Sequence, residues 1–221
     1  MKQRKKVIVL GKGSLAIRIS DWFLNSNEYD LIYTVPVIPE PTWTDSFKNW
    51  SSSKNIPTVD SGDYNDITGI NSNDWKVDLC FSVFYDKIIK EWFIKKCEQI
   101  LNLHNAPLPR YRGVRPINWA LKNNEKKHGV TIHEITPGID DGPIISQLEY
   151  SIYPYFDEVK DVYGRALEYG WTLFLQTIPI LEKITPEIQD ESMATYYSKK
   201  EDHLLGERAD FTKEASLKHS D

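Results

Sequence analysis

The sequence predicts an α/β fold with a mainly parallel sheet. Residues 7–10 form a short apolar run that ends in glycine, which is typical of a buried parallel strand. The glycine turn opens into apolar residues at helical spacing, and a second apolar, β-branched run follows at 29–37. Strand and helix patterns continue to alternate along the chain, and this alternation indicates parallel strands joined by helices.

Each expected element follows from its own pattern. The strands share a run of apolar or β-branched residues bounded by turn-forming residues, and they span 7–10, 29–37, 56–59, 77–83, 100–104, 130–136 and 144–150. The helices share apolar residues three and four positions apart, and they span 15–25, 43–53, 88–97, 116–123 and 159–183. We expect the last helix to stop near Pro179, and the last two strands to pair as a hairpin.

Length and charge limit the classes of protein that fit. The chain has 221 residues, and its 27 basic and 32 acidic side chains give a net charge of −5. At roughly 150 residues per domain, we predict one domain over 1–190 and a short C-terminal extension over 191–221 without a second globular domain. The acidic balance argues against a nucleic-acid partner. No apolar run is long enough for a signal peptide or a membrane span, so we expect a cytoplasmic protein without membrane association.

The two cysteines, Cys80 and Cys97, are too few for a disulfide scaffold or a four-thiolate zinc site. Both lie in apolar or helical surroundings. We therefore expect reduced, buried thiols and predict no metal site.

The first turn, Gly11-Lys12-Gly13-Ser14, allows several interpretations. Glycines let a backbone approach a phosphate, and the N-terminus of the following helix favours an anion. A dinucleotide site also needs an acidic residue about 20 positions further on, and Asp30 precedes the second strand instead of closing it. Contact with a substrate phosphate and a plain tight turn therefore both stay open, with dinucleotide binding less favoured.

Asn102 and His104 are the strongest candidates for chemistry. Side chains alternate across a strand, so both project from one face of the run at 100–104. The prolines at 107 and 109 end this strand, which places the pair at its carboxyl end, where α/β sheets bind ligands. An amide donor beside an imidazole suits acyl transfer, although a solvated strand end is the simpler alternative.

The loop at 137–143 contains the pair Asp140-Asp141 between two expected strands. A plain turn would explain the Asp-Gly sequence. A functional role requires one carboxylate to face His104, where it would orient the imidazole and raise its pKa.

Five motifs in order resemble the formyltetrahydrofolate-dependent formyltransferases. That family includes enzymes that formylate methionyl-tRNA, glycinamide ribonucleotide and nucleotide-linked amino sugars. The motifs are Asn-Leu-His at 102–104, Leu-Pro-Arg-Tyr-Arg-Gly at 108–113, Pro-Ile-Asn-Trp-Ala at 116–120, His-Gly-Val-Thr-Ile-His at 128–133 and Gly-Ile-Asp-Asp-Gly at 138–142. The similarity covers roughly residues 76–150, and the N-terminal strands fit the family more loosely.

The resemblance implies a Rossmann-like, mainly parallel twisted sheet flanked by helices, with 10-formyltetrahydrofolate as the formyl donor. It implies a catalytic set of Asn102, His104 and Asp140, with Asp141 as the alternative carboxylate. Asn102 would stabilise an oxyanion, His104 would accept a proton, and Asp140 would orient His104. The implied folate-binding residues lie in two loops, and they are Phe84, Tyr85, Lys87, Ile88, Thr136, Pro137, Gly138 and Ile139.

The resemblance favours a nucleotide-linked amino-dideoxy sugar as the acceptor. The motifs at 111–113, 118–121 and 128–133 are most similar to the nucleotide-sugar branch. This branch implies a role in surface polysaccharide synthesis, such as lipopolysaccharide O-antigen. The residues after 200 are too few for the β-barrel domain of the tRNA enzymes. Residues 11–14 would contact the acceptor's phosphates.

Two alternatives remain open. They are a glycinamide ribonucleotide formyltransferase and an NAD(P)-binding or other ligand-binding Rossmann protein. The sequence does not identify the nucleotide, the sugar, the amino position or the oligomeric state, and the resemblance is compatible with a homodimer. We expect His128 and His133 to be structural residues of their strand.

Overall fold

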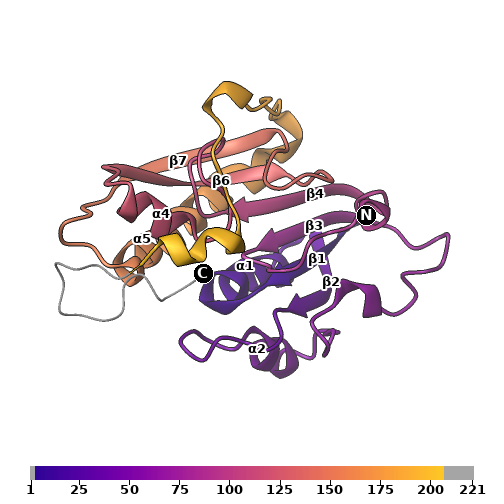
Figure 1. Ribbon diagram of the computed structural model, residues 1–221. Coiled ribbons are helices and arrows are strands. Elements are labelled where there is room, and N and C mark those ends of the chain that lie inside the picture. Colours follow the sequence, from indigo (N-terminus) through magenta and orange to yellow (C-terminus); the bar gives the residue numbers. More distant parts are fainter. Residues whose placement is uncertain (1–2, 207–221) are drawn as a thin grey trace. The chain divides into compact units, whose positions relative to one another are not determined.

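The computed structural model describes residues 3–206, which form two compact units (Figure 1). Within the described residues, the first unit comprises 3–103 and 134–137, and the second comprises 104–133 and 138–206. The fold is mixed α/β with mostly parallel strands, so the predicted fold class is confirmed. The predicted boundary at residue 190 stays a prediction, and residues 207–221 of the predicted extension lie outside the described residues.

The first unit contains four parallel strands in the order β2-β1-β3-β4. They are β1 (Lys5–Gly11), β2 (Tyr29–Pro36), β3 (Val77–Val83) and β4 (Cys97–His104), whose last residue is counted with the second unit. Helix α1 (Gly13–Leu24) packs against β1 and β2. The apolar residues of β1 and β3 are almost completely buried, as expected for strands covered on both faces.

The helix predicted over 88–97 is wrong in extent. Helix α3 spans only Glu91–Ile94, and β4 already begins at Cys97, which pairs with Val77. The phenol of Tyr64 explains the late start of the helix. It donates a hydrogen bond to the Ile88 carbonyl at 3.1 Å and accepts one from the Lys90 N–H at 3.0 Å. These contacts hold 88–90 in an extended loop, which leaves Ile88 72% exposed.

Two further elements differ from the prediction. The expected strand at 56–59 is reduced to one isolated bridge between Thr58 and Thr34. The expected helix at 43–53 forms only as α2 (Phe47–Ser53). It begins there because Ser46 caps it, with its hydroxyl accepting the Asn49 N–H at 3.0 Å.

The expectation that both cysteines are buried is confirmed for Cys80 and is wrong for Cys97. Cys97 is the first residue of β4 and is partly exposed.

The second unit is built on the predicted hairpin, which the structure confirms. Strands β6 (Lys127–Glu134) and β7 (Ile144–Ser151) pair antiparallel. Helix α5 (Val159–Thr177) packs against β7 and against α4 (Pro116–Lys122). Residues Ile178–Lys183 continue as a 3-10 helix, η2, so the α-helix ends before Pro179 as expected.

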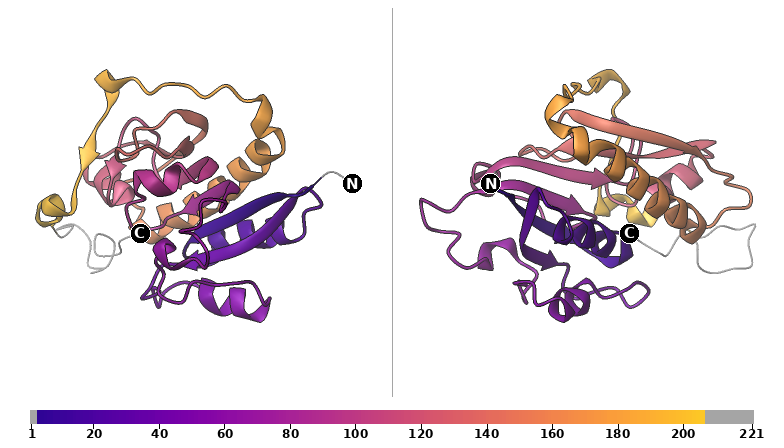
Figure 2. Two further views of the ribbon diagram at one scale, coloured as in Figure 1. Left: turned by 90° about the vertical axis from the view of Figure 1, so that its right-hand side faces the viewer. Right: turned by 180° about the vertical axis from the view of Figure 1, so that it is seen from behind.

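The C-terminal part of the second unit returns to the middle of the chain. After α5 the backbone runs extended and then turns back, as the orange-to-yellow trace of Figure 2 shows. Strand β8 (Tyr196–Tyr197) pairs in parallel with β5 (Arg112–Gly113), and the 3-10 helices η3 (Glu191–Met193) and η4 (Lys199–Leu204) flank it. We call residues 187–197 the C-terminal strap. Among residues 3–206, no helix combines the length and apolar character needed to cross a membrane.

Candidate active site

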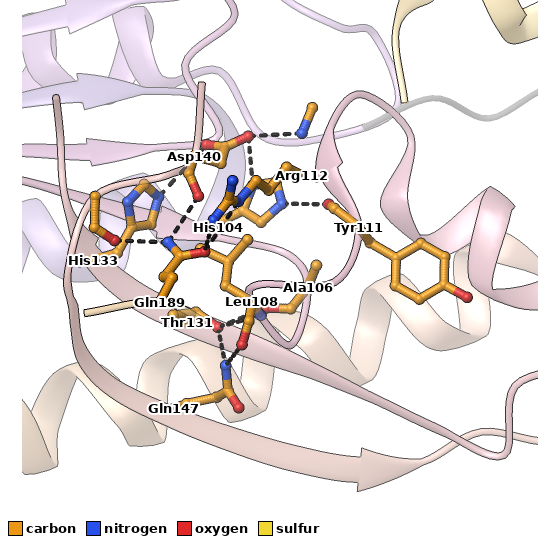
Figure 3. A network of polar contacts seen from close by, with 12 residues as sticks. His104, Ala106, Leu108, Tyr111, Arg112, Thr131, His133, Asp140, Gln147 and Gln189 are labelled. Carbon is orange, nitrogen blue, oxygen red and sulfur yellow. Dashed lines mark hydrogen bonds and ion pairs between the residues drawn. The ribbon is translucent and has the colours of Figure 1, made fainter. Parts of the chain in front are cut away.

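His104 ends β4, and its two ring nitrogens face the Tyr111 carbonyl and the Asp140 carboxylate (Figure 3). Its Nε2 lies 2.9 Å from the Tyr111 carbonyl oxygen, and its Nδ1 lies 3.6 Å from Asp140 Oδ2. Because a carbonyl oxygen only accepts, the contact with Tyr111 requires a proton on Nε2. The imidazole is only 8% exposed, so its orientation is set by these neighbours.

The turn after His104 is fixed by side chains of the β6–β7 hairpin. Thr131 Oγ donates to the Ala106 carbonyl at 2.7 Å and accepts the Leu108 N–H at 3.2 Å. Gln147 Nε2 donates to the Leu108 carbonyl at 2.8 Å. Figure 3 shows these contacts beside His104. They satisfy backbone groups that cannot join a sheet near the prolines, and so they keep the end of β4 in place.

A functional role for the loop at 137–143 requires a carboxylate that faces His104, and Asp140 supplies it. Its Oδ2 faces His104 and accepts the Gly113 N–H at 2.9 Å, and its Oδ1 is 3.5 Å from His133 Nε2. Burial alone would raise the pKa of Asp140. The two imidazoles and the Gly113 N–H outweigh that effect and hold the pKa well below its usual value. The carboxylate is therefore ionised throughout the neutral range.

Asp141 has different surroundings from Asp140. Its carboxylate packs against Gly138, where an added Cβ would come within 1.9 Å of Asp141 Oδ2. Asp141 is exposed, whereas the Asp140 side chain is only 14% exposed. Of the two adjacent acids, Asp140 is the one whose carboxylate faces His104.

Asn102 lies two residues before His104 on β4, in register with Ser82 of β3. It is partly exposed, whereas Leu101 and Leu103 are completely buried. The alternation of the strand therefore turns the two leucines to one face and Asn102 to the other, as the sequence predicts.

The predicted folate-binding residues lie in two loops. Those at 84–88 join β3 to α3, and Thr136 and Pro137 belong to the same unit. Tyr85 is anchored, because its hydroxyl donates to the Gly62 carbonyl at 2.7 Å. Ile88 is exposed, and Lys87 lies 3.7 Å from Asp63. In the second unit, Gly138 and Ile139 are exposed. Their role in binding a folate stays a prediction.

The glycines of the first turn have a structural explanation. A Cβ on Gly11 would come within 2.4 Å of the Val83 carbonyl oxygen. Gly13 has a φ of +72°, and a Cβ there would lie 2.6 Å from Thr44 Oγ. Lys12 is buried, and its N–H donates to the Val83 carbonyl at 3.3 Å. Ser14 lies in the first turn of α1. Close packing thus accounts for the two glycines, and phosphate contact stays a prediction.

Three residues beside Asp140 were missed as site residues by sequence reasoning. His133 lies on the same face of β6 as Thr131. Two polar residues on one face of a buried strand are the sequence pattern that could have identified His133 as a site residue. Arg112 lies in the motif at 108–113, but no pattern separates it from a surface arginine. Gln189 had no signal, because it lies in a polar segment 49 residues after Asp140.

His128 has the surroundings of a structural residue. It is completely buried, and its Nε2 lies 2.9 Å from the Asn105 carbonyl oxygen. Burial lowers its pKa to about 3 against the opposing effect of that carbonyl, with smaller contributions from His104 and Arg110. Among residues 3–206, no group of three or more potential ligands could hold a metal ion.

The sequence matches one family model and many curated proteins. Residues 60–178 match the family described as formyl transferase. The bifunctional polymyxin resistance protein ArnA of Wigglesworthia glossinidia brevipalpis is 32% identical over 165 residues, which cover 73% of this chain and 25% of that protein. The methionyl-tRNA formyltransferase of Deinococcus radiodurans is 40% identical over 96 residues, covering 43% and 30%. The chain thus spans a third or less of these relatives.

Solved structures match over a larger share of their length. An N-formyltransferase from Helicobacter canadensis, in complex with folinic acid and dTDP-3-aminofucose, has a TM-score of 0.75 and 25% identity, covering 90% of this chain and 72% of that one. WlaRD, a sugar 3N-formyl transferase crystallised with dTDP and 5-N-formyl-THF, has a TM-score of 0.76 and 26% identity, covering 90% and 71%. PseJ from Anoxybacillus kamchatkensis, in complex with a UDP-linked 4-formamido sugar and tetrahydrofolate, has a TM-score of 0.62 and 25% identity, covering 90% and 88%.

Proposed function

The chain belongs to the formyl transferase family, and from this premise we propose that it formylates the amino group of a nucleotide-linked amino-dideoxy sugar. The formyl donor is 10-formyltetrahydrofolate. The observation that carries the proposal is the His104–Asp140 pair at the end of β4, with Asn102 two residues earlier on the same strand. An ionised carboxylate, an imidazole and an amide are the groups that acyl transfer to an amine needs.

The roles of the three side chains follow from their chemistry. When bound, 10-formyltetrahydrofolate supplies the formyl carbon that the neutral amine attacks. Asn102 donates a hydrogen bond to the formyl oxygen as negative charge gathers on it. His104 takes at Nδ1 the proton that the amine loses, because its Nε2 already carries the proton donated to the Tyr111 carbonyl. His104 then gives that proton to N10 of the folate as the bond between N10 and the formyl carbon breaks, so that tetrahydrofolate leaves. Asp140 faces Nδ1 of His104 and complements the positive charge that the ring gains.

The loops at 84–88 and 136–139 have features that suit a folate. Ile88 and Ile139 are large apolar side chains that are 72% and 43% exposed, and an aromatic ligand would remove such surface from water. Tyr85, tied to the Gly62 carbonyl, holds the first loop in a defined conformation. We assign the donor to these loops through Phe84, Tyr85, Lys87, Ile88, Thr136, Pro137, Gly138 and Ile139.

The choice of acceptor rests on the solved relatives. Three of them were crystallised with a dTDP or UDP nucleotide or nucleotide sugar together with a folate. Helix α1 begins at Gly13 without a side-chain cap, and an uncapped helix N-terminus favours an anion. We propose that residues 11–14 contact the phosphates of the acceptor. We further propose that the enzyme acts in surface polysaccharide synthesis of the O-antigen type, in the cytoplasm and as a homodimer.

A panel of acceptors tests this function. The purified chain would be incubated with 10-formyltetrahydrofolate and one of several dTDP- or UDP-linked 3-amino and 4-amino sugars, or with glycinamide ribonucleotide. We expect a formamido product, detected by mass spectrometry, from at least one nucleotide sugar. Formylation of glycinamide ribonucleotide alone would establish the purine-pathway alternative, and no transfer to any acceptor would refute the proposal.

A further inference from the structure

Gln189, in the C-terminal strap, holds the backbone on both sides of Asp141. Its Nε2 donates to the Asp140 carbonyl at 2.9 Å and to the Gly142 carbonyl at 2.7 Å. The side chain is buried, with the residue only 5% exposed. The amide thus reaches across the loop that carries the candidate carboxylate.

The other end of the same amide is anchored to a buried arginine. Gln189 Oε1 accepts from Arg112 Nε at 3.1 Å and from Arg112 Nη2 at 2.8 Å. Both donors and both acceptor positions of the amide are therefore used. A flipped amide would turn its oxygen toward two carbonyl oxygens and its nitrogen toward a guanidinium, so the network allows one orientation.

Asp140 needs such support because its backbone is unusual. Its φ is +52°, in the left-handed region that residues other than glycine rarely adopt. A residue in that conformation stays there only when its surroundings enforce it. The hydrogen bonds from Gln189 to the carbonyls of Asp140 and Gly142 do so on both sides of Asp141.

The strap also fixes the element that holds the carboxylate of Asp140. The Gly113 N–H donates to Asp140 Oδ2, and Gly113 belongs to β5, which pairs with β8 of the strap. The Arg112 N–H donates to the Thr195 carbonyl at 2.9 Å, and the Val114 N–H donates to the Tyr197 carbonyl at 3.0 Å. The backbone and the carboxylate of Asp140 therefore both depend on the strap.

We propose that Gln189 is a positioning residue that keeps the Asp140 carboxylate facing His104. The kinetic part of this inference rests on the proposed function, because it takes Asp140 as part of the formyl-transfer machinery. The structural part concerns only the placement of the carboxylate and is measured without substrate.

Two replacements separate the two ends of the amide. Gln189→Glu keeps an oxygen that accepts from Arg112 but removes the two N–H donors to the backbone carbonyls. Gln189→Met has a similar volume but neither the acceptor nor the donors. We expect each variant to lower kcat by about 10- to 100-fold, because a small displacement of a catalytic group costs this much. The KM for the sugar nucleotide should change by less than about twofold, since no substrate contact is removed.

Glu191→Gln is the matched control. Glu191 accepts hydrogen bonds from Arg112 Nη1 at 3.0 Å and from Arg112 Nη2 at 2.7 Å, and its side chain is 71% exposed. Glu191→Gln replaces a carboxylate by an amide, which is the reverse of the change in Gln189→Glu, at a position two residues away. We expect kcat to stay within about twofold of the unsubstituted chain, since the amide oxygen that replaces the exposed carboxylate still accepts from Arg112.

A titration of the substrate-free protein gives the second measurement. With ¹³C-labelled aspartate, NMR follows the Asp140 carboxyl of each chain. In both Gln189 variants the pKa of Asp140 should rise toward its usual value, because the carboxylate moves away from His104, His133 and the Gly113 N–H. In Glu191→Gln it should stay low. Thermal unfolding shows that each variant is folded, and Gln189→Glu decides the outcome should Gln189→Met not fold.

The outcomes are distinct. A normal kcat in Gln189→Glu would overturn the inference, because the hydrogen bonds to the carbonyls would then be dispensable. An unchanged pKa of Asp140 in the folded Gln189 variants would overturn it as well. Absence of formyl transfer by the unsubstituted chain would refute the proposed function instead, and the titration would still decide the role of Gln189.

Discussion

Asn102 and His104 are two residues apart on one strand, and we expect their replacement by alanine to remove different catalytic contributions. Asn102→Ala removes a hydrogen-bond donor to the developing charge, and the loss of one such donor costs about 10²–10³ in turnover. His104→Ala removes the proton acceptor, worth about 10²–10⁴. Steady-state kinetics with the best nucleotide sugar would measure both. Near-normal turnover in either folded variant would contradict the assignment.

Asp140 and Asp141 form a natural pair of test sites. Asp140→Asn removes the charge that faces His104, and we expect kcat to fall by about 10²–10⁴. The pKa of Asp140 lies well below its usual value, so the native carboxylate stays ionised, and the loss in Asp140→Asn should persist from about pH 5 to pH 9. Asp141→Asn is the control, because that exposed carboxylate packs against Gly138. A larger loss in Asp141→Asn than in Asp140→Asn would reverse the assignment.

At the scale of elements, the pairing of β5 with β8 joins the C-terminal strap to the site. Gly113 has a φ of +91°, and an added Cβ would come within 2.1 Å of the Tyr197 carbonyl oxygen. We expect Gly113→Ala to lower the free energy of unfolding by at least about 1–3 kcal/mol and to reduce activity, because the Gly113 N–H holds Asp140. Urea unfolding and kcat would be measured together.

The same substitution in α5 is the control for Gly113→Ala. Gly164 lies inside this helix, is exposed, and has no heavy atom within 4 Å of an added Cβ. Gly164→Ala should raise the free energy of unfolding by about 0.5–1 kcal/mol, because alanine restricts the unfolded chain and favours the helix. Equal effects of the two substitutions would show that the contact between β5 and β8 contributes nothing.

The contrast between β3 and the C-terminal strap shows how far local pattern predicts this fold. Residues 77–83 are a continuous apolar run, and the strand forms over these same residues. The strap has no periodic pattern, since its conformation depends on β5, more than 80 residues earlier. The helix predicted at 88–97 failed for a similar reason, because the phenol of the distant Tyr64 holds 88–90 in a loop.

The candidate site likewise contains residues that local sequence patterns identify and residues that only long-range contacts bring together. Asn102 and His104 follow from strand alternation, and Asp140 from a motif whose place beside His104 no local rule could supply. Gln189 and Arg112 meet only in the folded chain, at a sequence separation of 77 residues. Sequence patterns thus identify groups that carry chemistry, whereas the groups that position them depend on long-range pairing.

At the scale of the whole molecule, buried ionisable groups determine how acid affects stability. His128 has a folded pKa of about 3, and an unfolded histidine has a pKa of about 6.5. Between these values the unfolded chain binds a proton that the folded chain does not. The free energy of unfolding therefore falls as pH falls through this window, by up to about 1.4 kcal/mol per pH unit. Asp140 adds nothing in this window until the pH nears its unfolded pKa, because its carboxylate is ionised in both states above it.

His128→Gln tests this dependence. Glutamine does not titrate, and its amide can still donate to the Asn105 carbonyl that His128 Nε2 contacts. We expect the variant to be less stable than the native chain at pH 7, where the imidazole packs as a neutral group, and to lose less stability between about pH 6 and pH 4.5. Urea unfolding at several pH values would measure the two slopes. Parallel slopes would mean that His128 is protonated in the folded chain at these pH values or that its side chain reaches water there. A shallower slope in the variant would assign the acid sensitivity to this single buried imidazole.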